Sequence, residues 1–176
     1  NLGAPGPKPG MQNCQQAGSC DVVFSYPMFR DLERTQTALT GLAAHTAFGA
    51  SLSVNNEPTV GRGMLVSGQY FPTLQVQAAH GRLLTPSDDA VVSANYVVVL
   101  GHEFWVDRFG SDASAVGQTM IINGRTFSIV GVAPEGFYGT TLGVRPDVYV
   151  PLSMWAMVEP GANPNRFERR NAYWLY

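Results

Sequence analysis

Three histidines are the first residues to test for chemistry, because imidazole is the commonest general base and metal ligand in proteins. His45 lies in a predicted strand, His80 in a predicted loop, and His102 at a predicted helix start beside Glu103. A catalytic or ligating histidine needs an orienting partner and a nucleophile or metal, and the spacing supplies none of these. The sequence after His102 does not reach a second histidine, so the zinc-protease helix motif is absent. We therefore expect solvated or structurally hydrogen-bonded roles for all three.

The acidic pair Asp88-Asp89 raises the question of calcium binding or acid–base catalysis. A calcium loop needs several oxygen ligands at set intervals, and SDDAVVSAN supplies too few. Adjacent side chains in a loop usually diverge, so we expect a solvated loop.

Other motifs are equally weak. Ser67-Gly68 and Ser93 lack a nucleophile elbow. The glycines of GRG (61–63) and GVRPD (143–147) are too few for a phosphate-binding loop. Several aromatic side chains could line a ligand groove, although their spacing favours a place in the core: Phe104, Trp105, Phe137, Tyr138 and Trp155. The sequence therefore predicts no catalytic, cofactor-binding or metal-binding residue, and no enzyme activity.

Cys14 and Cys20 are the two cysteines of the chain, separated by the small polar segment QQAGS. Two isolated cysteines this close favour a disulfide in an oxidising compartment. Free thiols remain an alternative, and a metal site is a weaker one because it would need more ligands.

Composition limits the class of protein. The chain has 176 residues, of which 45% are hydrophobic and 14% charged, with a net charge of -2. These values suit one domain or two small lobes with a true core. They exclude a basic surface for nucleic acid. The longest apolar runs, such as 96–100, are too short to cross a bilayer, and no signal peptide pattern is present.

The first half of the chain predicts a flexible lead-in over 1–24, then a helix and a hairpin. The lead-in begins with the Gly- and Pro-rich segment NLGAPGPKPG. Ser25 can cap an amphipathic helix that starts at Tyr26 and fades toward Gly41. AAHTAFGASLSV and TVGRGMLV predict a hairpin turning at NNEP, with a bulge or close approach at Gly49 or Gly61. Ser67 can cap a short helix that turns its apolar side chains inward: Tyr70, Phe71 and Leu74.

The second half contains the clearest pattern. NYVVVLG predicts a central strand buried on both sides, followed by a helix over GHEFWVDRFG. Asn123-Gly124 predicts a type I′ hairpin, since both turn residues tolerate positive φ. This register pairs Met120 with Phe127, and puts Met120, Ile122, Phe127 and Ile129 on one face. DVYVPL, SMWAMV and AYWLY predict a strand, one or two helical turns and a last strand. The order of elements predicts an α+β fold with a mixed sheet and helices on one face.

Several segments together resemble the periplasmic core domain of MacB-like, FtsX-superfamily ABC transporter permeases. The motifs are VSGQYFPTL, GRLLTPSDD, VVVLGHEFW and GQTMIINGRTFSIVGVAPEGF. Their residues are most similar to those of the branch in which the permease unit is duplicated in one chain. The resemblance runs from Ser25 to Leu152 and returns at RNAYWLY. It implies a core domain over 25–176 that is truncated at its C-terminal end, because the family continues through another strand–helix–strand unit.

The resemblance implies a porter-like lobe with a smaller inserted lobe, on the extracytoplasmic face of the inner membrane and as part of a membrane protein. It implies mechanotransmission without a cofactor. The implied partners are the transmembrane helices of the same permease, a separate ATP-binding subunit or domain on the cytoplasmic side, and in some members a periplasmic adaptor. Phe137 and Tyr138, in the loop after the hairpin, are the candidate partner contacts, with core packing as their alternative.

Three function hypotheses follow. The first is a non-catalytic domain that relays conformational change within an ABC permease. The second is a periplasmic ligand-binding or sensory domain, which requires an apolar pocket with a few convergent polar groups. The third is a hydrolase, which requires a triad or carboxylate pair.

Overall fold

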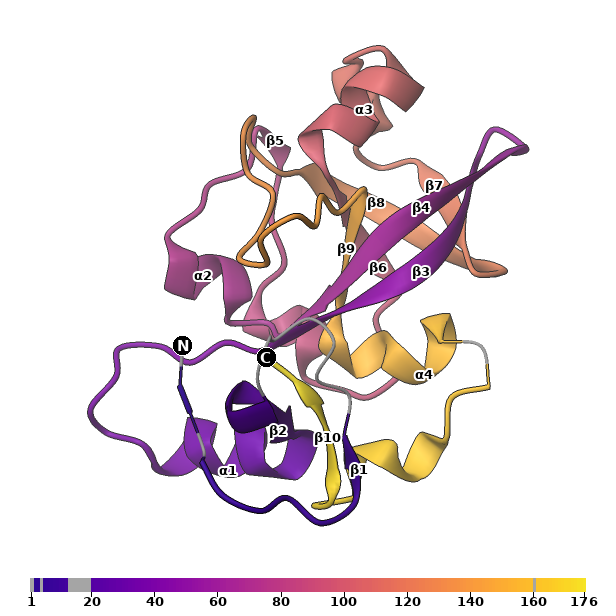
Figure 1. Cartoon of the computed structure of the whole chain (residues 1–176). Coiled ribbons are helices and arrows are strands. Elements are labelled where there is room, and N and C mark those ends of the chain that lie inside the picture. The colour runs from indigo at the N-terminus through magenta and orange to yellow at the C-terminus, as the bar shows by residue number, and fades with distance from the viewer. Residues whose placement is uncertain (1, 4, 13–19, 160) are drawn as a thin grey trace.

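A computed structural model describes residues 2–3, 5–12, 20–159 and 161–176 (Figure 1). The strands are β1 (Met11–Gln12), β2 (Phe24–Ser25), β3 (His45–Val54), β4 (Glu57–Val66), β5 (His80–Gly81), β6 (Val97–Leu100), β7 (Thr119–Ile122), β8 (Arg125–Val132), β9 (Val148–Pro151) and β10 (Ala172–Leu175). The helices are α1 (Tyr26–Thr35), α2 (Tyr70–Leu74), α3 (His102–Phe109) and α4 (Trp155–Val158). Short 3-10 turns are η1 (Cys20–Val22), η2 (Pro86–Asp89), η3 (Ala113–Ala115), η4 (Leu152–Met154) and η5 (Pro164–Phe167).

The larger sheet closes on itself. Its seven strands run in the order β5-β8-β6-β9-β4-β3-β7, and β7 also pairs with β8. The strands from β8 round to β7 therefore form a ring. The pairs β6–β8 and β4–β9 are parallel and the remaining pairs are antiparallel. The expected α+β fold with a mixed sheet is confirmed, and its closure removes most free strand edges.

Both faces of the central strands are buried. Along β6, Val98 and Leu100 belong to one hydrophobic cluster, whereas Val99 belongs to a second one. This confirms that the VVVL segment is a central strand, and its all-apolar sequence follows from burial on both sides. Helices α3 and α4 pack against the first cluster and α2 against the second. Helices thus contribute to both hydrophobic clusters, where helices on one face were expected.

The hairpin of β7 and β8 has the predicted register. Met120 pairs with Phe127 and Ile122 with Arg125. Asn123 and Gly124 have φ values of 47° and 79°, as a type I′ turn requires. The predicted apolar face is buried, with none of its four side chains more than 2% exposed.

Asn123 connects this turn to two other elements. Its Oδ1 accepts a hydrogen bond from Ser51 N in β3 at 2.6 Å, and its Nδ2 donates to Gly49 O at 3.1 Å. Nδ2 also donates to Val158 O at the end of α4. The Asn123 side chain therefore links the hairpin to β3 and to α4.

The hairpin of β3 and β4 turns at Asn55-Asn56, within the predicted NNEP segment. Its register is continuous from Val54↔Glu57 to His45↔Val66, so the predicted bulge is wrong. The alternative, a close approach, holds at Gly61, where an added Cβ would lie 2.7 Å from Asp147 Oδ2. At Gly49 nothing lies within 4 Å of such an atom.

The short elements differ in part from expectation. Ser25 caps α1 as predicted, accepting a hydrogen bond from Met28 N at 3.4 Å. Ser67 does not cap α2, because its hydroxyl instead accepts from Ala44 N at 3.0 Å. Tyr70 and Phe71 point inward, but Leu74 is 36% exposed and the prediction for it is wrong. Helix α2 is only five residues long and has no third position on its buried face.

The smaller sheet is built from both ends of the described chain, in the order β1-β10-β2. In Figure 1 the smaller sheet and α1 lie below the larger sheet. The strands of the larger sheet come from the sequence between α1 and β10. The inserted part is thus the larger one. Part of the expected lead-in contributes to the smaller sheet, since Met11 and Gln12 pair with Ala172 and Tyr173.

The helices are all short. None of those in the described residues has the length and apolar character that a membrane span would need.

We predict that Asn123→Ala lowers the free energy of unfolding by about 2–3 kcal/mol, because three hydrogen bonds to other elements are lost. Asn56→Ala is the matched control. It also places alanine at positive φ, with Asn56 at 65°. Asn56 makes no side-chain hydrogen bond among the described residues, so only the backbone cost of about 1 kcal/mol remains. Urea unfolding followed by circular dichroism gives both values, and equal losses would contradict the role of Asn123.

Candidate functional site: an apolar pocket at the junction of the two sheets

A pocket of about 570 Å³ lies where the smaller sheet meets the larger one. Five parts of the chain form it: the start of the chain with β2 and α1, the connection from α1 to the first residue of β3, helix α2, the loop at 140–142, and the end of β10 with Tyr176. The lining residues are Leu2, Val22, Phe24, Phe29, Leu32, Leu39, Gly41, Leu42, Ala43, Ala44, His45, Tyr70, Thr73, Leu74, Thr140, Thr141, Leu142, Leu175 and Tyr176.

The lining is mostly apolar, with a few polar groups. Among the described residues that form it, none is Asp, Glu, Lys or Arg. The polar members are the imidazole of His45, two tyrosine hydroxyls and three threonines. Pockets for small molecules have this character, with a few placed polar groups in an apolar wall.

Three of these polar groups form a network. Thr140 Oγ1 lies 2.9 Å from His45 Nε2 and 3.3 Å from the Tyr70 hydroxyl. Thr140 N also donates to that hydroxyl at 3.2 Å. Gly139 permits this approach, because it has a φ of 81° and an added Cβ would lie 3.1 Å from the Tyr70 oxygen. The network fixes the loop at 139–142 against the pocket wall.

His45 also connects the two sheets. His45 N donates to Tyr176 O, and Tyr176 N donates to His45 O, both at 3.0 Å. The two rings stack with centroids 5.9 Å apart. Burial lowers the pKa of His45 to about 4, so its imidazole is neutral at neutral pH. The predicted structural role is confirmed for this histidine.

The other two histidines, His80 and His102, both lie against the ring of Trp105. The Trp105 ring centroid lies 4.8 Å from that of His80 and 5.4 Å from that of His102. In the part of the chain that the structure describes, no group of three or more His, Cys, Asp or Glu side chains could hold a metal ion.

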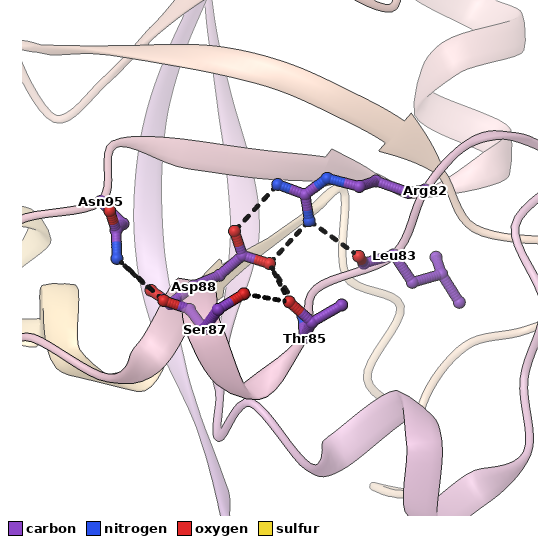
Figure 2. Close-up of polar contacts among 6 residues, drawn as sticks. All are labelled: Arg82, Leu83, Thr85, Ser87, Asp88 and Asn95. Carbon is purple, nitrogen blue, oxygen red and sulfur yellow. Dashed lines mark hydrogen bonds and ion pairs between the residues drawn. The ribbon is translucent and has the colours of Figure 1, made fainter.

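Asp88 is buried rather than solvated, so the solvated-loop prediction is wrong. Figure 2 shows the polar contacts around its carboxylate. Its Oδ2 and Oδ1 accept hydrogen bonds from the two Arg82 nitrogens at 2.6 and 2.9 Å. Oδ2 also accepts from Thr85 N at 2.8 Å, which closes a capping box at the start of η2. These hydrogen bonds outweigh the burial and lower the pKa of Asp88.

Asp89 points the other way, as adjacent side chains were expected to do. Its Oδ1 accepts from Ser153 N at 2.6 Å and its Oδ2 from Gly68 N at 3.2 Å. Burial is the main cause that raises the pKa of Asp89. The two carboxylates satisfy backbone N–H groups that would otherwise be buried without partners, and sequence spacing could not reveal those partners.

Phe137 and Tyr138 are both half-buried. The Phe137 ring packs 5.8 Å from Phe71 and belongs with the second hydrophobic cluster. The Tyr138 hydroxyl donates to Glu103 Oε1 at 2.7 Å, and the Arg145 guanidinium lies 4.6 Å from the Tyr138 ring centroid. Their role as partner contacts stays a prediction.

The remaining aromatics are core residues. Phe104, Trp105 and Trp155 are each no more than 6% exposed. Neither they nor Phe137 and Tyr138 line the pocket. The predicted Cys14–Cys20 disulfide involves Cys14, which lies outside the described residues, so this pairing stays a prediction.

The sequence matches one family, described as the MacB-like periplasmic core domain, over residues 4–171. Two proteins similar to this chain are named as an ATP-binding/permease protein and as an ABC transporter permease. The chain belongs to the MacB-like periplasmic core domain family, and the resemblance noted in the sequence is confirmed. The match also extends into the segment 1–24, for which no family motif was recognised.

Two relatives are known by name. The chain is 29% identical over 119 residues to the macrolide export ATP-binding/permease protein MacB of Aggregatibacter actinomycetemcomitans, which covers 67% of this chain and 18% of that protein. It is 28% identical over 98 residues to the ABC transporter permease YvrN of Bacillus subtilis strain 168, which covers 53% of this chain and 23% of that protein. The chain therefore spans less than a quarter of either relative's length.

Solved structures show the same fold. The periplasmic region of MacB from Actinobacillus actinomycetemcomitans superposes with a TM-score of 0.65 at 17% identity, covering 95% of this chain and 86% of that one. The extracellular domain of the transporter YknZ from Gram-positive bacteria gives 0.62 at 14% identity, covering 95% and 96%.

Sequence reasoning missed the pocket. Its residues come from five distant parts of the chain and have no shared period. One weak signal was Leu142, a lone apolar residue in the loop GTTLG between two glycines, which is fully exposed in the structure.

We predict that burial of His45 makes the protein less stable in acid. Its pKa falls from 6.5 unfolded to about 4 folded, so the unfolded chain takes up the proton first. Stability contributed by the neutral ring is present above pH 6.5 and is lost as pH falls toward 4, by about 1–3 kcal/mol.

Urea unfolding at pH 7 and pH 4.5 measures this loss. His45→Gln should make the loss smaller by about the same amount, since glutamine does not titrate. Thr140→Val is the matched control, because it removes the hydrogen-bonding hydroxyl but keeps the titrating ring. The assignment fails if His45→Gln and the unmodified chain lose equal stability over this interval.

Proposed function

We propose that this chain is a non-catalytic extracytoplasmic domain of an ABC transporter permease, which relays conformational change. On one side are the transmembrane helices of the same permease and a separate ATP-binding subunit or domain in the cytoplasm. On the other side is a periplasmic substrate or partner, with an adaptor protein as one candidate. Family membership supports the location, on the outer face of the inner membrane.

The observation that carries the proposal is the way the two sheets are joined. Both ends of the described chain enter the smaller sheet, through β1, β2 and β10. The end of β10 is then hydrogen-bonded through Tyr176 to His45, the first residue of β3. A displacement imposed on the chain ends therefore reaches the longest hairpin of the larger sheet through backbone hydrogen bonds.

The larger sheet has the stiffness that a relay requires. Its strands form a ring, and the central strands are buried on both faces. Close-packed interiors transmit strain because they have low compressibility. A disulfide between Cys14 and Cys20 would add a covalent restraint in an oxidising compartment.

The pocket favours a second candidate function, a ligand-binding or sensory domain in the same compartment. It combines an apolar wall with the polar network of His45, Tyr70 and Thr140. Binding and relay are compatible, because His45 and Tyr176 belong to both the pocket and the junction.

We predict that Tyr176→Pro uncouples the two sheets, because proline cannot donate the hydrogen bond to His45 O. The test uses the full-length permease reconstituted in lipid with its ATP-binding part. A spin label at Val60→Cys, which is 92% exposed in the structure, reports its distance to spin-labelled lipid headgroups. ATP should change that distance in the unmodified permease, and Tyr176→Pro should abolish at least about half of the change.

Tyr176→Ala is the matched control, since it keeps the backbone N–H and should preserve the movement. ATP hydrolysis measured in the same samples shows that the ATP-binding part still works. A full movement in Tyr176→Pro, or no movement in any sample, would contradict the relay.

We also predict that the chain itself has no affinity for ATP in the micromolar range. Its sequence offers no phosphate-binding loop, and its pocket has no cationic side chain among the described residues. Isothermal titration calorimetry of the chain with ATP and Mg²⁺ tests this expectation. A saturable heat of binding at micromolar ATP would contradict this prediction.

A further inference from the structure

Four exposed leucines surround the junction pocket. Leu142 is fully exposed, and Leu2, Leu39 and Leu74 are between 36% and 43% exposed. They come from four separate segments, and all four line the same hollow. Scattered exposed apolar residues need no explanation, but a group gathered at one concavity marks a binding site.

The size and shape of the hollow limit what could fill it. At about 570 Å³ it lies within the usual range for small-molecule pockets, roughly 300–1,000 Å³. A second hollow of about 380 Å³ runs along α1 and shares Leu2, Phe24 and Leu32 with the first.

The electrostatics of the main pocket do not favour a charged ligand. No side chain that lines it among the described residues carries a formal charge at neutral pH, since burial keeps His45 neutral. A buried ion without a counter-charge is strongly disfavoured. The hydroxyls of Tyr70 and Thr140 can share hydrogen bonds with one polar group.

We propose that this pocket binds one neutral, predominantly apolar small molecule with a single polar end. The leucines rim a concavity lined by five chain segments, whereas a dimer interface needs a broad face of about 800 Å² on each copy. This inference rests on the proposed relay, because the bound ligand would act on the junction between the sheets. It would contact Tyr176, at the end of β10, and His45, at the start of β3, and so would bias the junction between the sheets.

The test uses the neutral fluorophore N-phenyl-naphthylamine, titrated into the chain of 176 residues after cooperative urea unfolding has shown that it is folded. We expect saturable, one-to-one enhancement of fluorescence. Its sulfonated analogue, anilinonaphthalene sulfonate, has the same aromatic skeleton with a negative charge and should bind about tenfold more weakly.

Leu39→Gln and Leu142→Gln should each weaken binding of the neutral fluorophore about fivefold. Val91→Gln and Val92→Gln are the matched controls, since these valines are 59% and 51% exposed but lie outside the pocket. They should leave the affinity unchanged within about twofold.

Three outcomes would overturn the proposal. One is the absence of saturable binding, and another is equal weakening by the leucine and valine variants, which would indicate unspecific adsorption. The third is a dimer, seen by analytical ultracentrifugation, that Leu142→Gln dissociates, which would assign the leucines to a second copy. Binding is measured on the chain alone and the relay on the membrane-embedded permease, so one can fail without the other.

Discussion

The larger sheet depends on the pairing of β7 with two strands at once. β7 forms four residue pairs with β8 and two with β3, and the second contact closes the ring. Asn123 secures that contact, because its side chain bonds to both Ser51 N and Gly49 O in β3. Without this contact β3 and β7 would each present an open edge, and open edges are sites of unwanted strand pairing. The most regular segment of the sequence thus performs a structural task that affects every other strand.

The junction between the sheets has a different character from the ring. It includes the backbone pair between His45 and Tyr176 and the aromatic packing around it, and one hydrophobic cluster extends across both sheets. The pocket adjoins this junction, so residues of both sheets line it.

Local features of the fold could be predicted from the sequence because their determinants are close together. The Asn123-Gly124 turn fixes the register of its own hairpin, and Ser25 caps the helix that follows it. Features set by distant residues could not be predicted. No pattern in the residues next to Asp88 and Asp89 predicts the donors to their carboxylates. These donors are Arg82, Gly68 and Ser153. The pocket and the ring closure are of this second kind, since each requires the folded positions of several segments.

The smaller sheet has a consequence for the order of folding. Met11 pairs with Ala172, and Ser25 pairs with Tyr173, so nearly the whole chain must be looped to form these contacts. Closing a loop of that length carries a large entropic cost, whereas the two long hairpins close only two-residue turns. The hairpins can therefore assemble early and the terminal strands join late. Residues from both sheets line the pocket. The pocket is therefore complete only after the terminal strands have paired, and a ligand bound there would distinguish fully folded molecules from partly folded ones.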